Sequence, residues 1–168
     1  MNIALVAHDA RKNELIGWVT YNIDTLKAHN LFATGTTGRL ISEICTVQHI
    51  PIACNEDGEA TAYDGIDSYP LKDNVTCLLS GPLGGDSQIG TMIAEGKIDV
   101  LIFFCDNLIT QGHQQDVGAL SRLASLYNIA FATNRTTADM ILTSSLFDNK
   151  EYKRVVPTAI EHYKNRKL

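Results

Sequence analysis

Residues 100–105 read VLIFFC, an apolar run without a polar interruption. Half-exposed antiparallel strands alternate apolar and polar side chains, whereas parallel strands covered on both faces are apolar throughout. The run therefore predicts a buried parallel strand. Because such strands are covered by helices on both faces of the sheet, the same run predicts a layered α/β architecture around it.

Four further short apolar runs surround this one along the chain, and segments with helical spacing separate them. The spacing of Leu15, Trp18 and Val19, for example, is typical of a helix with one buried face. We expect one doubly wound α/β domain, residues 1–168, with a five-stranded, mostly parallel sheet flanked by helices. The other expected strands are Ile3–Ala7, Leu31–Ala33, Val75–Leu79 and Ile129–Ala132.

Residues 48–74 interrupt this alternation between the second and third expected strands. The segment holds two glycines, two prolines and a cluster of acidic residues where a crossover needs only a short connection. We expect a surface insertion within the single domain, with a small hairpin formed by HIPIAC (residues 49–54) and EATAY (residues 59–63). We interpret it as a solvated excursion without a catalytic part; a role in assembly or regulation is the alternative.

The composition is that of an ordinary globular protein, with 45% hydrophobic and 20% charged residues, which excludes collagen-like and disordered classes. The formal net charge of −5 argues against nucleic acid or an anionic membrane as a partner, although one phosphate can still bind locally. No apolar run approaches the roughly 18 residues of a membrane-spanning helix, and the four cysteines show no CxxC spacing. We expect a cytoplasmic protein.

Polar residues follow each expected strand, at the carboxyl edge where parallel sheets bind ligands. The stretch TGTTG, residues 34–38, is typical of a phosphate cradle, because glycine admits close backbone approach and threonine hydroxyls add donors. Ser80 and Gly81 supply a second donor set, and Lys12 supplies a cation. Helix capping by a threonine is the alternative for the first stretch. Together these features predict a phosphate site.

Three residues at the same edge are candidates for proton transfer: Asp86, His113 and Asp116. As alternatives, the two aspartates could cap helices and the histidine could simply be exposed. His8 and Asp9 form either a structural hydrogen-bonded pair or direct substrate contacts. No dinucleotide, P-loop, HExxH or GxSxG motif is present, so we expect neither metal nor organic cofactor. An aspartate base, an imidazole donor and a held phosphate fit proton abstraction beside a carbonyl.

Two residues at the end of the expected strand 100–105, its last residue and the one after it, are interpreted as structural. Asp106 is expected to satisfy backbone N–H groups or to orient its neighbours. Cys105, in an apolar run without a nearby base, is expected to be an inert buried thiol.

Several stretches of the sequence match one known enzyme family. They are IALVAHD with Lys12, LFATGTTGRLI, LLSGPLGGDSQIG, EGKIDVLIFF, the run from Asp106 through His113 to Asp116, and NIAFATNRTTAD. On these motifs the sequence resembles the methylglyoxal synthases. The resemblance covers most of the chain apart from the insertion and the C-terminal end. Cys105 and Asn107 stand where the family commonly has Trp and Pro.

The resemblance implies conversion of dihydroxyacetone phosphate to methylglyoxal and inorganic phosphate, with phosphate as product and inhibitor and with a homohexamer as the assembly. It implies that Asp86 is the catalytic base, with His113, Asp116 and Asp9 beside it. The alternative is a non-catalytic, metabolite-sensing regulatory domain of the same fold, which needs the phosphate cradle but not the base. The implied substrate-binding residues are His8, Lys12, Thr34, Gly35, Thr36, Thr37, Ser80 and Gly81.

Overall fold

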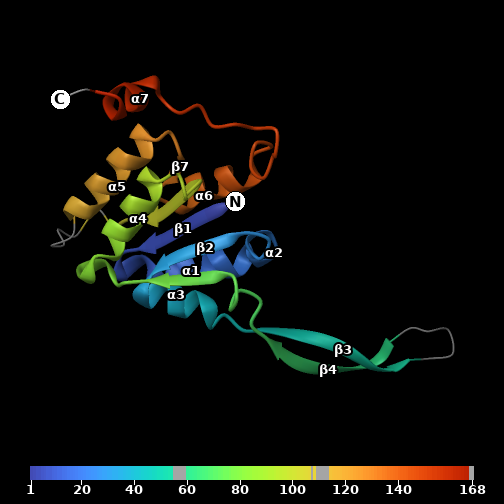
Figure 1. Cartoon of the computed structure of the whole chain (residues 1–168). Coiled ribbons are helices and arrows are strands. Elements are labelled where there is room, and N and C mark those ends of the chain that lie inside the picture. Colours follow the sequence, from blue (N-terminus) through green and yellow to red (C-terminus); the bar gives the residue numbers. More distant parts are fainter. Residues whose placement is uncertain (55–59, 107, 109–113, 167–168) are drawn as a thin grey trace.

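The computed structural model describes residues 1–54, 60–106, 108 and 114–166. A five-stranded sheet lies at its centre in the order β5–β2–β1–β6–β7, and its strand pairs are parallel (Figure 1). The α/β fold expected from the sequence is thus confirmed. The strands of this sheet are β1 (Asn2–Ala7), β2 (Asn30–Thr34), β5 (Val75–Leu78), β6 (Val100–Phe104) and β7 (Ala130–Ala132).

Helices connect the strands and cover the sheet on both faces. Each crossover returns the chain to the amino edge, so the strands all end at the same carboxyl edge. None of the helices in the described parts of the chain is long and apolar enough to cross a membrane. The helices are η1 (Asp9–Arg11), α1 (Lys12–Tyr21), α2 (Ile23–Leu26), α3 (Gly35–Ser42), η2 (Gly81–Leu83), α4 (Gly85–Ala94), α5 (Gln114–Leu126), α6 (Arg135–Thr143) and α7 (Thr158–Lys164).

The sheet separates two hydrophobic cores. Ile3 and Leu5 of β1 face one core, and Ala4 and Val6 face the other, because successive side chains of a strand point to opposite faces. Helices α1, α3 and α6 cover the first core, and α4 and α5 cover the second. Continuous apolar strands are therefore what this architecture requires.

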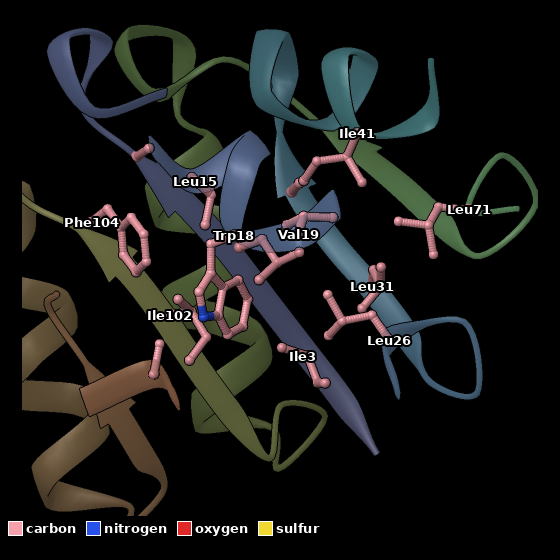
Figure 2. Close-up of a cluster of buried hydrophobic side chains, with 14 of the residues drawn as sticks. Ile3, Leu15, Trp18, Val19, Leu26, Leu31, Ile41, Leu71, Ile102 and Phe104 are labelled. Atoms are coloured by element: carbon pink, nitrogen blue, oxygen red, sulfur yellow. The ribbon is translucent and has the colours of Figure 1, made fainter. Parts of the chain in front are cut away.

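The first core is built around Trp18 of α1, which is fully buried (Figure 2). Burial of a large apolar side chain stabilises the fold by about 1.5–3 kcal/mol. The indole Nε1–H donates to Asp139 Oδ1 on α6 at 2.7 Å, so the polar end of the ring is satisfied as well. This bond ties two helices together over the same face of the sheet.

A hairpin leaves the body between α3 and β5. Strands β3 (Thr46–Cys54) and β4 (Ala60–Ser68) pair antiparallel as a separate two-stranded sheet, as the sequence predicted. We call these two strands the arm, and Figure 1 shows it projecting from the amino-edge side of the body. Leu71, within the predicted surface insertion 48–74, is fully buried in the first core. The C-terminal end of the insertion therefore belongs to the body, because its apolar side chain packs in the first core.

Candidate active site

A cavity of about 310 Å3 opens at the carboxyl edge of the sheet. Three strand-to-helix turns form it, those after β1, β2 and β5, and β6 supplies part of its wall. Residues from widely separated parts of the sequence therefore meet here. Its lining consists of Val6, Ala7, His8, Asp9, Lys12, Thr34, Thr36, Thr37, Ser80, Gly81, Pro82, Asp86 and Phe103.

The turn after β1 presents a buried histidine whose tautomer is set by the backbone. His8 Nδ1 accepts a hydrogen bond from the Asp106 N–H at 2.8 Å. In a neutral imidazole the other nitrogen then carries the proton. His8 Nε2 is buried and has no hydrogen-bond partner among the described residues, so its N–H is available to a ligand. Phe103 meets the ring edge to face at 5.1 Å and restricts its rotation.

Asp106 itself has the structural role that the sequence predicted. Its carboxylate Oδ1 accepts from the Leu108 N–H at 3.1 Å, while its own N–H holds His8. Cys105 before it is buried, and desolvation raises the pKa of its thiol to about 11 despite an opposing effect of Arg11. A thiol in that state is not a nucleophile at neutral pH.

Lys12 brings a positive charge to the cavity. It is the first residue of α1, and its Nζ lies 2.6 Å from Asp9 Oδ1. The Asp9 side chain is 87% exposed and that of Lys12 is 22% exposed, so water screens the pair and its contribution to stability is small. The ion pair instead holds the ammonium at the mouth of the cavity.

The turn after β2 has the geometry of an anion site. Thr34 is the extended residue before α3, and Thr36 and Thr37 lie in the first helical turn, where backbone N–H groups have no partner within the helix. The alternative of side-chain capping is not observed, because Thr34 is the N-cap and makes no side-chain cap bond. Thr37 Oγ1 is buried, and the described residues offer it no hydrogen-bond partner.

The turn after β5 places the carboxylate of Asp86. Gly84 has φ +100°, a conformation that glycine adopts without strain, and it redirects the chain from η2 into α4. Asp86 is the second residue of α4 and not its N-cap, so it occupies the first turn, where the helix dipole favours negative charge. A Cβ added at Gly81 would lie 2.9 Å from Asp86 Oδ2. The carboxylate therefore occupies the space that glycine leaves open.

The two phosphate-type turns are in direct contact. The Gly35 N–H donates to the Leu79 carbonyl at 3.1 Å, and a Cβ added at Gly35 would stand 3.0 Å from the Ser80 N and Cα atoms. Gly35 does not line the cavity. Its lack of a side chain allows the turn after β2 to contact the turn after β5. The structure brings together every other predicted binding residue, together with Asp86 and Asp9.

For two predicted catalytic residues, His113 and Asp116, the structure does not describe where the side chain lies. His113 lies outside the described residues. Asp116 is the third residue of α5, inside the helix rather than capping it, and its side chain lies outside the description. Pro82 and Phe103 line the cavity but were not predicted. Phe103 is one apolar residue of a buried strand, and the sequence holds no signal that distinguishes it from its neighbours.

Comparison with known proteins agrees with this geometry. The family model described as "MGS-like domain" matches residues 63–133. A methylglyoxal synthase of Maridesulfovibrio salexigens is 47% identical over 99% of this chain and 97% of that relative, and one of Proteus mirabilis is 45% identical over 98% and 91%. A crystal structure of methylglyoxal synthase from Elizabethkingia anophelis superposes with a TM-score of 0.74 at 38% identity, covering 99% of this chain and 91% of that one.

Proposed function

This chain belongs to the methylglyoxal synthase family, and we propose that its carboxyl-edge cavity converts dihydroxyacetone phosphate to methylglyoxal and inorganic phosphate. The observation that carries the proposal is the meeting of two anion-binding turns, a lysine and Asp86 around one small cavity. Phosphate recognition and a base are the two things this reaction needs from a protein. The substrate is a small molecule, in keeping with the cavity volume of about 310 Å3.

The phosphate group binds between the two turns. The first turn of α3 supplies the backbone N–H groups that follow Gly35 and the Thr36 and Thr37 hydroxyls, and the turn after β5 supplies Ser80 and Gly81. Lys12 adds the positive charge, held in place by Asp9. The buried Thr37 hydroxyl supports this assignment, because a buried polar atom without a partner is costly unless a ligand satisfies it.

Asp86 acts as the base. Its carboxylate takes a proton from the hydroxymethyl carbon, and the C–H electron pair forms the enediolate. The Nε2–H of His8 donates to the substrate's carbonyl oxygen, where negative charge develops, as its tautomer and burial permit. His113 moves protons among the enediolate oxygens, and Asp116 orients it; these two roles rest on the family resemblance.

Phosphate then leaves by elimination. The enediolate electrons form a new double bond as the bridging C–O bond breaks, and phosphate departs with the bonding pair. This step is favourable when the C–O bond stands perpendicular to the enediolate plane, so the site must fix a torsion as well as bind charge. Two turns in contact through Gly35 and Ser80 suit that task. The product is the enol of methylglyoxal, which ketonises.

Three further properties belong to the proposal. The chain assembles as a homo-oligomer, a hexamer by resemblance to the family. Inorganic phosphate inhibits the reaction because it binds the same turns as the substrate's phosphate group. The protein works in the cytoplasm, where triose phosphates occur.

The direct test is product formation. Purified protein incubated with dihydroxyacetone phosphate is expected to release methylglyoxal and inorganic phosphate in equal amounts, measured together over time. Binding of dihydroxyacetone phosphate without either product would contradict the proposal and favour a sensor of the same fold.

A further inference from the structure

Leu79 is the residue after β5. Its backbone carbonyl and its backbone N–H are each hydrogen-bonded to a different helix. Its carbonyl accepts from the Gly35 N–H of α3 at 3.1 Å. Its N–H donates to the side-chain Oε1 of Gln88 on α4 at 2.8 Å. Because β5 is an edge strand of the sheet, its own ladder leaves the residues at its end poorly fixed. Helices α3 and α4 supply the hydrogen bonds that fix Leu79.

The same residue is packed tightly between the two helices. A Cβ added at Gly85 would collide with the Leu79 carbonyl oxygen, and one added at Gly35 would press on the Ser80 backbone. Backbone atoms cannot give way as a flexible side chain can. Leu79 and Ser80 therefore set the spacing between the first turn of α3, which binds phosphate, and the first turn of α4, which carries Asp86.

Gln88 is the member of this set that acts through a side chain. It lies two residues after Asp86 on α4, is exposed, and does not line the cavity. Accepting the proposed function, we propose that Gln88 is a positioning residue: its carboxamide locks α4 to Leu79 and so aligns Asp86 with the bound phosphate for elimination. Gln88 touches no reacting atom in this scheme.

The two fates of the enediolate make this role measurable. Reprotonation at carbon returns the substrate and, in D2O, leaves deuterium in it, because the carboxyl proton of Asp86 exchanges with solvent. Elimination breaks the C–O bond and releases phosphate. Only elimination depends on the torsion between phosphate and enediolate. Without the Gln88 bond the Leu79–Ser80 turn holds the phosphate torsion less well, whereas proton abstraction by Asp86 is common to both fates. The ratio of deuterium exchange to methylglyoxal formation therefore rises.

The test compares Gln88→Leu, which removes the acceptor, with Gln88→Glu, which keeps one. In D2O, Gln88→Leu is expected to raise the exchange-to-elimination ratio about fivefold, the factor expected for one net hydrogen bond, whereas Gln88→Glu stays near wild type. Ser87→Ala, the neighbouring exposed position, is the matched control and leaves the ratio unchanged. Amide exchange by NMR is expected to show a protected Leu79 N–H in wild type and loss of that protection in Gln88→Leu.

A partly unfolded variant loses exchange and elimination in proportion, so its ratio does not move. An unchanged ratio in an active Gln88→Leu enzyme would overturn the inference, as would a Gln88→Glu enzyme that behaves like Gln88→Leu or a Leu79 N–H unprotected in wild type. Wild-type protein that yields neither deuterated substrate nor methylglyoxal would instead overturn the proposed function, and the Leu79 amide measurement would still decide whether Gln88 holds the Leu79 N–H.

Discussion

At the scale of single residues, the orientation of the Asp86 carboxylate depends on the absence of a side chain at Gly81. A Cβ at Gly81 would lie 2.9 Å from Asp86 Oδ2, closer than real Cβ contacts occur. Because the carboxylate is the end of a flexible side chain, an added methyl group would turn it aside rather than unfold the protein. A residue without a side chain thus controls the position of the base.

Replacement of Gly81 by alanine tests this dependence. Gly81→Ala is expected to lower kcat about 10- to 100-fold, because small displacements of a catalytic group are costly, with a smaller change in KM and little change in Tm. Steady-state kinetics and thermal unfolding measure these effects. The control is Gly17→Ala in α1, where an added Cβ meets nothing within 4 Å. Equal kcat values for the two variants would contradict the account.

The described cysteines differ in their exposure to solvent, and therefore in their reactivity. Burial raises the pKa of Cys105 from 9.0 to about 11, whereas Cys45 and Cys77 are exposed. At pH 8 a thiol reagent is expected to modify Cys45 and Cys77 in the native protein but Cys105 only after denaturation, as peptide mass mapping would show. Native labelling of Cys105 at the rate of Cys77 would contradict its burial.

The same raised pKa gives a pH dependence of stability. The folded value lies above the unfolded one, so the protonated thiol stabilises the fold fully below about pH 9, and this contribution is lost as the pH rises towards 11. Comparison of Cys105→Ser with wild type in urea titrations at pH 8 and pH 10.5 is expected to show a smaller difference in the free energy of unfolding at the higher pH. An equal difference at both pH values would contradict this assignment.

At the scale of elements, the site is made by the apposition of two strand-to-helix turns. The turn of α3 approaches that of α4 so closely that a Cβ at Gly35 would stand 3.0 Å from the Ser80 N and Cα atoms. Here the neighbouring atoms are backbone, so an added side chain must move a whole turn. The distance between the two donor sets is therefore controlled by one glycine.

Gly35→Ala is expected to separate the turns and weaken phosphate binding. KM for dihydroxyacetone phosphate and the inhibition constant of inorganic phosphate are both expected to rise about tenfold, with a smaller fall in kcat, since binding in ground and transition states is lost together. Gly118→Ala on α5, where a Cβ meets nothing within 4 Å, serves as control. A variant with unchanged phosphate inhibition would contradict the role of the contact.

Much of this arrangement could be predicted because parallel strands buried on both faces appear in the sequence as continuous apolar runs. The run Val100–Cys105 indicated β6, and of the polar turns predicted to meet at the ligand edge, those after β1, β2 and β5 line the cavity. Gln88 and Phe103 could not be found in this way. Gln88 is an exposed polar residue on a helix, and Phe103 one apolar residue among several, so their roles depend on contacts that only the folded chain makes.

At the scale of the whole molecule, the excess negative charge belongs to residues 46–68, the segment that contains the arm. Between Thr46 and Ser68 the sequence has five acidic residues and no Lys or Arg, which matches the formal net charge of −5 of the full chain. The body is therefore neutral overall, and its cavity can attract a phosphate without working against a large net charge. The arm also leaves the body on the side away from the carboxyl edge (Figure 1).

Replacement of residues 48–66 by a short turn is expected to leave kcat and KM within about twofold of wild type. The physical reason is that the two strands pair mainly with each other and lie far from the cavity, while buried Leu71 and the rest of the body remain. Steady-state kinetics and circular dichroism are the measurements. A folded but inactive variant would show that the arm contributes to the site and is not separate from the cavity.

In the whole enzyme, Asp86 takes the proton while other groups hold the phosphate, and the variant Asp86→Asn separates these two tasks. An amide of the same shape removes the base but leaves both turns in place. In Asp86→Asn, kcat for methylglyoxal formation is expected to fall by about 10³-fold, while the dissociation constant of inorganic phosphate, measured by calorimetry, stays within about twofold of wild type. A kcat near the wild-type value would show that Asp86 is not the base.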